Sequence, residues 1–185
     1  MKGIVFTEFL EMVDDKFGFE VTEHIIEKSK HQLSTQGAYT AVGTYPHHEI
    51  IALVSSLSQQ SHIPISQLVT VFGEHLLGQF AKKYGVFFST VNDTFSFLNS
   101  IDNHIHVEVK KLYPNAQLPK FECYHPNNEE NKLVMIYTSE RAMSDLASGL
   151  IEGTIKYYKE NITFSKTIID ESQGTKVKFE LERQP

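Results

Sequence analysis

The first half of the chain carries its apolar residues at helical spacing. Val5, Phe9 and Met12 recur every three or four positions, which predicts a helix over 2–17. The same spacing, with glycine and proline at the element boundaries, predicts further helices along this half. They are expected over 21–30, from Pro46 to about Leu57, over 64–84 and over 91–112, with a loop and turns over 39–45.

After Pro114 the pattern changes to alternation. Phe121 and Cys123 alternate with polar neighbours, and a polar turn then leads to a strand over 132–138, which predicts a hairpin. Residues 142–158 return to helical spacing. A second hairpin is expected from 161–170 and 175–183 around Ser172-Gln173-Gly174, because Val177, Phe179 and Leu181 alternate with charged residues. The predicted fold class is α+β, with helices first and then an antiparallel sheet of about four strands with an inserted helix.

Composition limits the classes of function. The 185 residues are 41% hydrophobic and 22% charged, as in a single globular domain. The formal net charge of −6 argues against nucleic acid as a partner. The longest aliphatic run covers only 50–54 and the first residues form no signal-peptide core, so we expect no membrane partner and a cytoplasmic location. A single cysteine, Cys123, excludes an internal disulfide and a multi-cysteine zinc site, and we expect it to be buried filler, with a redox role left open.

Two short patterns carry candidate chemistry. His104 and His106 fall in the helix expected over 91–112, where positions two apart point ~200° away from each other and so cannot share a metal ion. The two histidines lie about equally far from the centre of the apolar stripe of that helix, so the pattern does not show which one faces the interior. Both can be histidines at the edge of the stripe that bind no ligand. Tyr137-x-Ser139-x-Arg141 places three hydrogen-bonding groups on one side of a strand, a cradle suited to carboxylates. The alternative is a surface arginine with Ser139 capping the next helix.

The chain resembles the H-NOX family of haem nitric oxide/oxygen-binding domains, which also occurs in soluble guanylate cyclase and in bacterial sensors. The residues that carry the resemblance are the opening Met1-Lys2-Gly3-Ile4-Val5-Phe6, the stretch 105–114 and Tyr137-x-Ser139-x-Arg141. It covers essentially the whole chain. It implies one domain over 1–185, with a helical subdomain over about 1–63, a second subdomain over about 64–185, and a haem b (iron protoporphyrin IX) between the helical and C-terminal parts.

The resemblance also implies roles for particular residues. The family's iron-ligating histidine precedes the aromatic of the Tyr113-Pro114 step by seven residues, which points to His106. The chain departs from the family at Asp102, four residues before His106 where the family has an acidic residue three before its ligand, so His104 stays as an alternative. The resemblance further implies that Tyr137, Ser139 and Arg141 bind the haem propionates, and that Pro119 presses on the haem and distorts it.

The gas selectivity is expected to follow from the distal residues that the resemblance implies. Leu146 occupies the position where oxygen-binding members place a tyrosine, and it cannot donate a hydrogen bond to O₂. The other distal positions are also apolar, and we therefore predict binding of NO, weaker binding of CO and no stable O₂ complex. These other positions are Val5, Leu76, Phe80 and Leu150.

The expected mechanism is sensing and not catalysis. The resemblance implies that NO breaks the bond between iron and His106 and that the long helix is then released from the iron. It also implies that Pro119 allows the haem to relax towards planarity and that the two halves shift. The partner it implies is a separate sensor histidine kinase or cyclic-di-GMP enzyme.

Two further functions compete with this interpretation. One is a non-haem metal hydrolase that uses His47, His48, His104 or His106, although no His-Glu-x-x-His motif is present. The other is a haem-free interaction module. A different tetrapyrrole, such as a cobalamin or a bilin, would give a different absorption spectrum.

Overall fold

The helices and strands follow the predicted order. The computed structural model describes residues 1–171 and 175–185, so the turn expected at Ser172-Gln173-Gly174 lies outside the described residues. The helices are α1 (Gly3–Phe17), α2 (Phe19–Ser29), α3 (His47–Ser61), α4 (Ile65–Lys83), α5 (Gly85–Ser89), α6 (Thr94–Ser100), α7 (His106–Leu112) and α8 (Ser144–Tyr158). The π-helical turn Ile101–Ile105 joins α6 to α7, and short 3-10 turns lie at Lys30–Gln32 and Pro126–Asn128. The strands are β1 (Lys120–Tyr124), β2 (Lys132–Ser139), β3 (Ile162–Asp170) and β4 (Thr175–Arg183).

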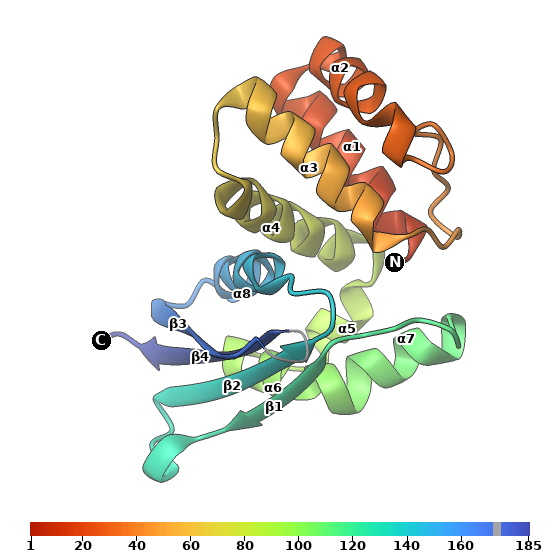
Figure 1. The fold of residues 1–185 in the computed structure, drawn as a ribbon. Helices are drawn as coiled ribbons and strands as arrows, with labels where there is room; N and C mark the ends of the chain where they lie inside the picture. The colour runs from red at the N-terminus through yellow and green to blue at the C-terminus, as the bar shows by residue number, and fades with distance from the viewer. Residues whose placement is uncertain (172–174) are drawn as a thin grey trace.

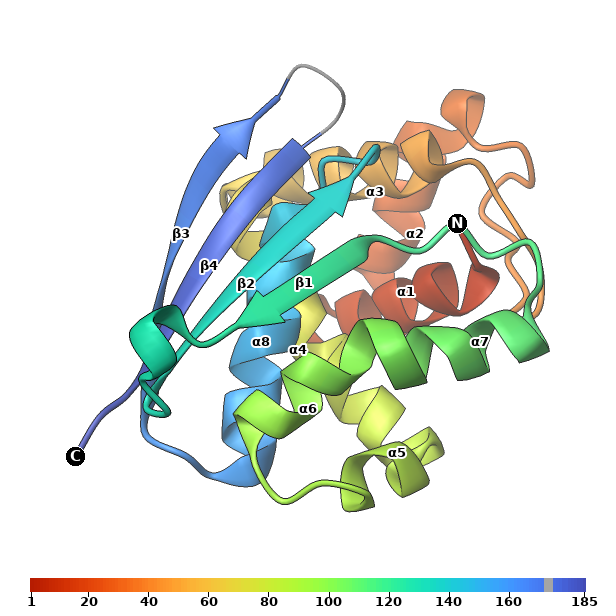
Figure 2. The same ribbon diagram turned by 90° about the horizontal axis from the view of Figure 1, so that it is seen from below.

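The elements form layers with α4 and α8 in the middle. Figure 1 shows α1, α2 and α3 together above α4, with α8 below α4 and the sheet below α8. The sheet is antiparallel with the order β1-β2-β4-β3, and Figure 2 shows α6 and α7 running beside its β1 edge. Helices first, then a four-stranded antiparallel sheet with α8 inserted between β2 and β3, confirm the predicted α+β class.

The sheet buries one face, as the alternation in β4 predicts. Val177, Phe179 and Leu181 are buried, and they pair across the strands with Tyr137, Met135 and Leu133 of β2. The charged residues between them point to the other face, where Lys178 and Glu180 form an ion pair of 2.9 Å. Every second residue of these strands is buried, so a shift by one residue would move the buried side chains to the exposed face. The burial pattern therefore fixes the register of the strands.

Helices α4 and α8 approach each other closely because glycines line their contact. A methyl group on Gly73 would lie 2.4 Å from the carbonyl oxygen of Leu146, and one on Gly149 would lie 1.9 Å from the carbonyl oxygen of Thr70. A side chain at either position would therefore force the two backbones apart. This contact sets the positions of the α4 and α8 side chains that face the N-terminal helices and the sheet.

Buried side chains form two clusters that meet within α4. The first gathers the inner faces of α1 to α3 and the residues of α4 up to Leu76. The second begins at Leu77 and joins α5, α6 and α8 to the sheet. Helix α4 thus packs against both parts of the molecule, and the subdomain boundary near residue 63 stays a prediction.

Several predicted element boundaries are wrong by a few residues. Pro46 and Pro64 precede α3 and α4 with extended ψ angles of 135° and 141°, and so are not the first helical residues. Helix α3 runs past Leu57 to Ser61, where His62 ends it in a left-handed conformation, and α8 begins at Ser144 and not at residue 142.

The largest difference lies in the helix expected over 91–112. It begins at Thr94, because the carboxylate of Asp93 accepts the backbone N–H of Ser96 and caps it. It also contains the π turn, which the 3.6-residue period does not predict. The short helix α5 was not predicted either. In the part of the chain that the structure describes, no helix combines the length and apolar character that a membrane crossing requires.

Candidate functional site

A mainly apolar cavity of about 350 Å³ lies where the N-terminus, α4, α8, the sheet and the α6–α7 run meet. Its volume and apolar lining are those of a site for an organic ligand. Apart from Tyr137 and Ser139, every predicted site residue lines it. These are His106, Pro119, Arg141, Val5, Leu76, Phe80, Leu146 and Leu150.

His106 is the histidine that lines the cavity. Its side chain is only 15% exposed, and its Nδ1 lies 3.2 Å from Oδ1 of Asp102, which also accepts the backbone N–H of Phe121 at 3.4 Å. This contact occupies Nδ1 and leaves Nε2 as the ring nitrogen available to a ligand. Burial lowers the pKa of His106 despite the raising effect of Asp102, so the neutral imidazole is favoured.

The π turn explains the four-residue spacing between Asp102 and His106. A π-helical turn closes its hydrogen bonds at i→i+5 and takes up one residue more than an α-helical turn. Asp102 lies inside this turn, and His106 is the first residue after it. The departure from the family's three-residue spacing is therefore matched by a local change of helix geometry.

His104 points elsewhere. It is exposed, and its ring lies edge-on to Phe87 of α5 with the ring centres 5.9 Å apart. It is not among the residues that line the cavity. Of the two histidines that the apolar stripe left unseparated, only His106 is placed to bind a ligand there.

Hydrogen bonds link the three residues of the predicted cradle, Tyr137, Ser139 and Arg141. Of the three, only Arg141 lines the cavity. Tyr137 is 3% exposed, and burial raises its pKa although Ser139 and the backbone of Met143 hydrogen-bond to it. Oγ of Ser139 accepts the backbone N–H of Arg141 at 3.2 Å. Because α8 begins after Met143 without a side-chain cap, Ser139 does not cap that helix.

The guanidinium group of Arg141 is held by a neutral partner. It donates to the backbone oxygen of Gln117 at 3.1 Å and to Oε1 of Gln117 at 2.9 Å. No acidic side chain among the described residues forms an ion pair with it at salt-bridge distance. Arg141 therefore keeps its charge uncompensated at the cavity wall, which suits an anionic ligand.

The apolar wall is built by three helices. Val5 comes from α1, Leu76 and Phe80 from α4, and Leu146 and Leu150 from α8. The close glycine contact between α4 and α8 fixes the last four relative to one another. The leucine side chain at position 146 gives this wall no hydrogen-bond donor there.

Sequence reasoning assigned no role to several polar residues on the cavity wall, among them Tyr84, Gln117 and Lys2. Tyr84 lines it, with a pKa raised by burial and by Tyr113, to which it hydrogen-bonds. Gln117 holds Arg141, and Nζ of Lys2 lies 4.6 Å from the centre of the Tyr113 ring. Of these three residues, only Lys2 lies in a stretch that carries the family resemblance. The contacts join segments far apart in the chain, so no local pattern indicates them.

The residues that line the cavity have the chemical properties that a haem site requires. A haem is a large apolar disc with an iron that takes an imidazole ligand and with two carboxylates at one edge. The site offers an apolar slot, one buried neutral histidine and one uncompensated arginine. For the hydrolase alternative, the described residues contain no group of three or more His, Cys, Asp or Glu that could hold a metal ion.

Solved structures of other proteins match the whole chain. The unliganded Fe(II) H-NOX protein from K. algicida is 39% identical, with a TM-score of 0.91 over 100% of this chain and 97% of that one. An H-NOX protein from S. oneidensis in the Fe(II)NO state is 26% identical, with a TM-score of 0.89 over 100% of both chains. The H-NOX from Shewanella woodyi in the Fe(II)CO state, bound to IWP-051, is 38% identical with a TM-score of 0.83 over 100% and 95%.

Sequence comparison leads to the same family. Soluble guanylate cyclase gcy-35 of Caenorhabditis elegans is 26% identical over 147 residues, which are 77% of this chain and 20% of that protein. The chain thus spans about a fifth of the length of this relative. The Haem-NO-binding family model matches residues 2–166. The chain belongs to this family of haem-gas-binding domains, the H-NOX family.

Proposed function

We propose that the protein holds a haem b through His106 and senses nitric oxide. The observation that carries the proposal is the placement of His106 on the cavity wall, with Asp102 occupying Nδ1. A carboxylate on the second ring nitrogen is the usual support of a metal-ligating histidine, because it fixes the tautomer and the orientation of the ring. Ferrous haem would supply the iron to which NO binds.

Arg141 would bind the carboxylates of the haem. It now donates two hydrogen bonds to the neutral Gln117, and exchange of these for a carboxylate gives stronger, charge-assisted bonds. Ser139 supports the backbone of Arg141, and Tyr137 supports Ser139 from the core. In this structure Ser139 and Tyr137 position Arg141, and we propose that they join it in binding the carboxylates when the haem is bound.

The apolar wall supports selectivity for NO. Bound O₂ carries partial negative charge and is stabilised by a hydrogen-bond donor, whereas NO and CO depend on one much less. Leu146, Leu150 and Phe80 offer no donor. We expect NO to bind, CO to bind more weakly and no stable O₂ complex to form. The S. oneidensis and S. woodyi relatives have structures with NO and CO respectively.

We further propose that NO binding to the haem would release His106. A released His106 would free α7 from the cavity, and Pro119, also on the wall, would contact the bound haem. Ligand binding then biases a two-state element, as in other switches. We expect the protein to transmit this change in the cytoplasm to a sensor histidine kinase or a cyclic-di-GMP enzyme, without catalysis of its own.

Paired histidine substitutions test the proposal. His106→Gly should lose haem or bind it with a changed ferrous absorption spectrum, and added imidazole should restore the spectrum. His104→Gly is the matched control, since His104 is exposed on the same helical run, and it should keep the wild-type spectrum.

Each other outcome has a distinct meaning. If only His104→Gly changes the spectrum, the ligand is His104. If the wild type stays colourless after haem supplementation, the haem-free interaction module replaces the proposal. Stoichiometric zinc in a colourless protein would favour the hydrolase.

A further inference from the structure

The helical run that carries His106 consists of α6, the π turn and α7, and the burial of its side chains differs along its length. Its first part, α6, buries Phe95, Phe97 and Leu98 in the core beside the sheet. In the π turn and α7, all of whose residues the structure describes, no residue is fully buried. The beginning of the run is therefore part of the core, whereas the rest of it faces the cavity, which is lined by Ile101, Ile105, His106, Val109 and Leu112.

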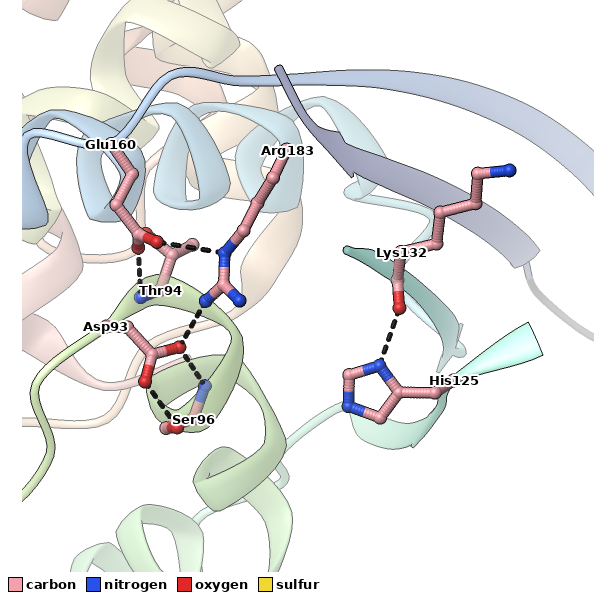
Figure 3. A network of polar contacts seen from close by, with 7 residues as sticks. All are labelled: Asp93, Thr94, Ser96, His125, Lys132, Glu160 and Arg183. Carbon is pink, nitrogen blue, oxygen red and sulfur yellow. Dashed lines mark hydrogen bonds and ion pairs between the residues drawn. The ribbon is translucent and has the colours of Figure 1, made fainter. Parts of the chain in front are cut away.

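A network of charged side chains holds the start of α6. Figure 3 shows Arg183, at the end of β4, between Glu160 and Asp93. Its Nε donates to Oε1 of Glu160 at 3.0 Å and one terminal nitrogen donates to Oδ1 of Asp93 at 2.7 Å. The guanidinium carbon also lies 4.3 Å from the centre of the Phe95 ring.

Both carboxylates in turn hold backbone N–H groups at the beginning of α6. Asp93 accepts the N–H of Ser96 at 3.0 Å and its hydroxyl at 2.6 Å, and Glu160 accepts the N–H of Thr94 at 2.5 Å. Burial would raise the pKa of Asp93, but Ser96 and Arg183 lower it overall. Arg183 thus joins a helix start, the α8–β3 junction and the last strand in one half-buried network, which is stronger than an isolated surface pair.

The far end of the run has weaker attachments. After α7, Tyr113 contacts Nζ of Lys2 at 4.6 Å from its ring centre and hydrogen-bonds to Tyr84. Lys2 also donates to the backbone oxygen of Val42 at 3.1 Å and to Oγ1 of Thr44 at 3.0 Å. The two hydrogen bonds of Lys2 are exposed contacts of a single side chain, each worth little in free energy.

We propose that Arg183 is a positioning residue that anchors α6, so that release of His106 moves α7 about the π turn while α6 stays in place. This proposal rests on the proposed function, because His106 must be tethered to be released. π-Helical turns inside α-helices are frequent sites of functional bending. The anchor makes the bend local, because the start of α6 lies ~18 Å from His106 at 1.5 Å per residue.

Hydrogen exchange of the haem-loaded, reduced protein tests the anchor with and without NO. In the wild type, NO should raise the exchange rate of amides in 106–113 by about tenfold and leave those of 94–100 unchanged. In Arg183→Gln, NO should raise exchange in both segments. Lys178→Gln, on the outer face of the same strand, is the matched control and should behave as the wild type.

A second variant keeps the test decisive if Arg183→Gln is too unstable. Asp93→Asn retains the cap but removes the ion pair with Arg183, and it should show the same spread of exchange into 94–100 in smaller degree. Equal exchange in 94–100 for the wild type and both variants, or a wild type in which both segments change together, would overturn the proposal.

Failure of the proposed function gives a different result. Absorption spectra of the same samples report whether NO binds and whether the histidine leaves. His106→Ala should release α7 without NO. Comparison of this variant with the double variant His106→Ala/Arg183→Gln therefore tests the anchor even if the spectra do not change with NO. Spread of exchange into 94–100 only in the double variant supports the anchor, and identical patterns contradict it.

Discussion

At the scale of single residues, Leu146 is the position where one hydroxyl group would alter which gas the site retains. Leu146→Tyr should give a protein that holds O₂ in air, because a donor on the apolar wall stabilises the negative charge of bound O₂ by about 1.5–3 kcal/mol. Leu146→Phe is the control with the same ring and no hydroxyl. Spectra in air should separate the two variants, and O₂ retention by Leu146→Phe or by the wild type would contradict the account.

Glu49 is a buried carboxylate whose partners make stability depend on pH. It is fully buried, with Oε1 accepting from Oγ of Ser34 at 2.6 Å and Oε2 accepting from the hydroxyl of Tyr39 at 2.7 Å. Burial alone would raise the pKa of Glu49, but these hydrogen bonds lower it overall below its ordinary 4.5. A lowered carboxyl pKa contributes stability that is present above pH 4.5 and lost as the pH falls through the folded value.

Tyr39→Phe should therefore lower the free energy of unfolding at pH 7 by about 2 kcal/mol, since it removes one hydrogen bond from a buried charge. Urea unfolding at a series of pH values measures this loss. The difference from the wild type should shrink as the pH falls below about 4, because protonated Glu49 needs its partners less. A difference that stays constant down to about pH 3 would contradict this, because the hydroxyl group of Tyr39 would then contribute stability that does not depend on the charge of Glu49.

At the scale of elements, the contact between α4 and α8 positions both helices of the apolar wall. A methyl group on Gly73 would meet the backbone of α8, whereas one on Gly78, which is exposed in the same helix, would meet no atom of the described residues within 4 Å. The same substitution should thus have opposite effects at the two glycines.

Gly73→Ala should destabilise the protein by about 1–3 kcal/mol, because the added methyl group separates two packed backbones. Gly78→Ala should stabilise it by about 0.5–1 kcal/mol, since alanine loses less backbone entropy in a helix. Thermal unfolding of the two variants measures both signs. If Gly73→Ala is as stable as Gly78→Ala, α4 and α8 do not pack as closely as described.

At the scale of the whole molecule, the sequence predicts most elements because burial follows a simple period. The alternation in β4 and the helical stripes of α1 and α4 each bury one face. The choice between His104 and His106 could not be made from periodicity, because the π turn shifts the helical phase just before His106. The family's spacing to Tyr113-Pro114 selected the histidine that lines the cavity.

Other features depend on contacts that no local pattern encodes. Arg183 meets Asp93 across 90 positions, and Lys2 meets the ring that follows α7. The glycine contact of α4 with α8 similarly depends on two helices that lie far apart in the chain. These contacts bring the predicted elements together around the site. They also hold the two ends of the helical run that carries His106 differently, with the network of Arg183 at the start of α6 and the contact of Lys2 after α7.

In the proposed function, His106 tethers a haem and is released by NO. The most direct measurement is the absorption spectrum of the reduced, haem-loaded protein, recorded without oxygen and then with air, CO and NO in turn. We predict a Soret band that does not change in air, that shifts with CO, and that moves with NO to the position of ferrous haem with NO bound and no histidine ligand. A stable spectrum of the O₂-bound form, or an NO spectrum that retains the histidine ligand, would contradict the account.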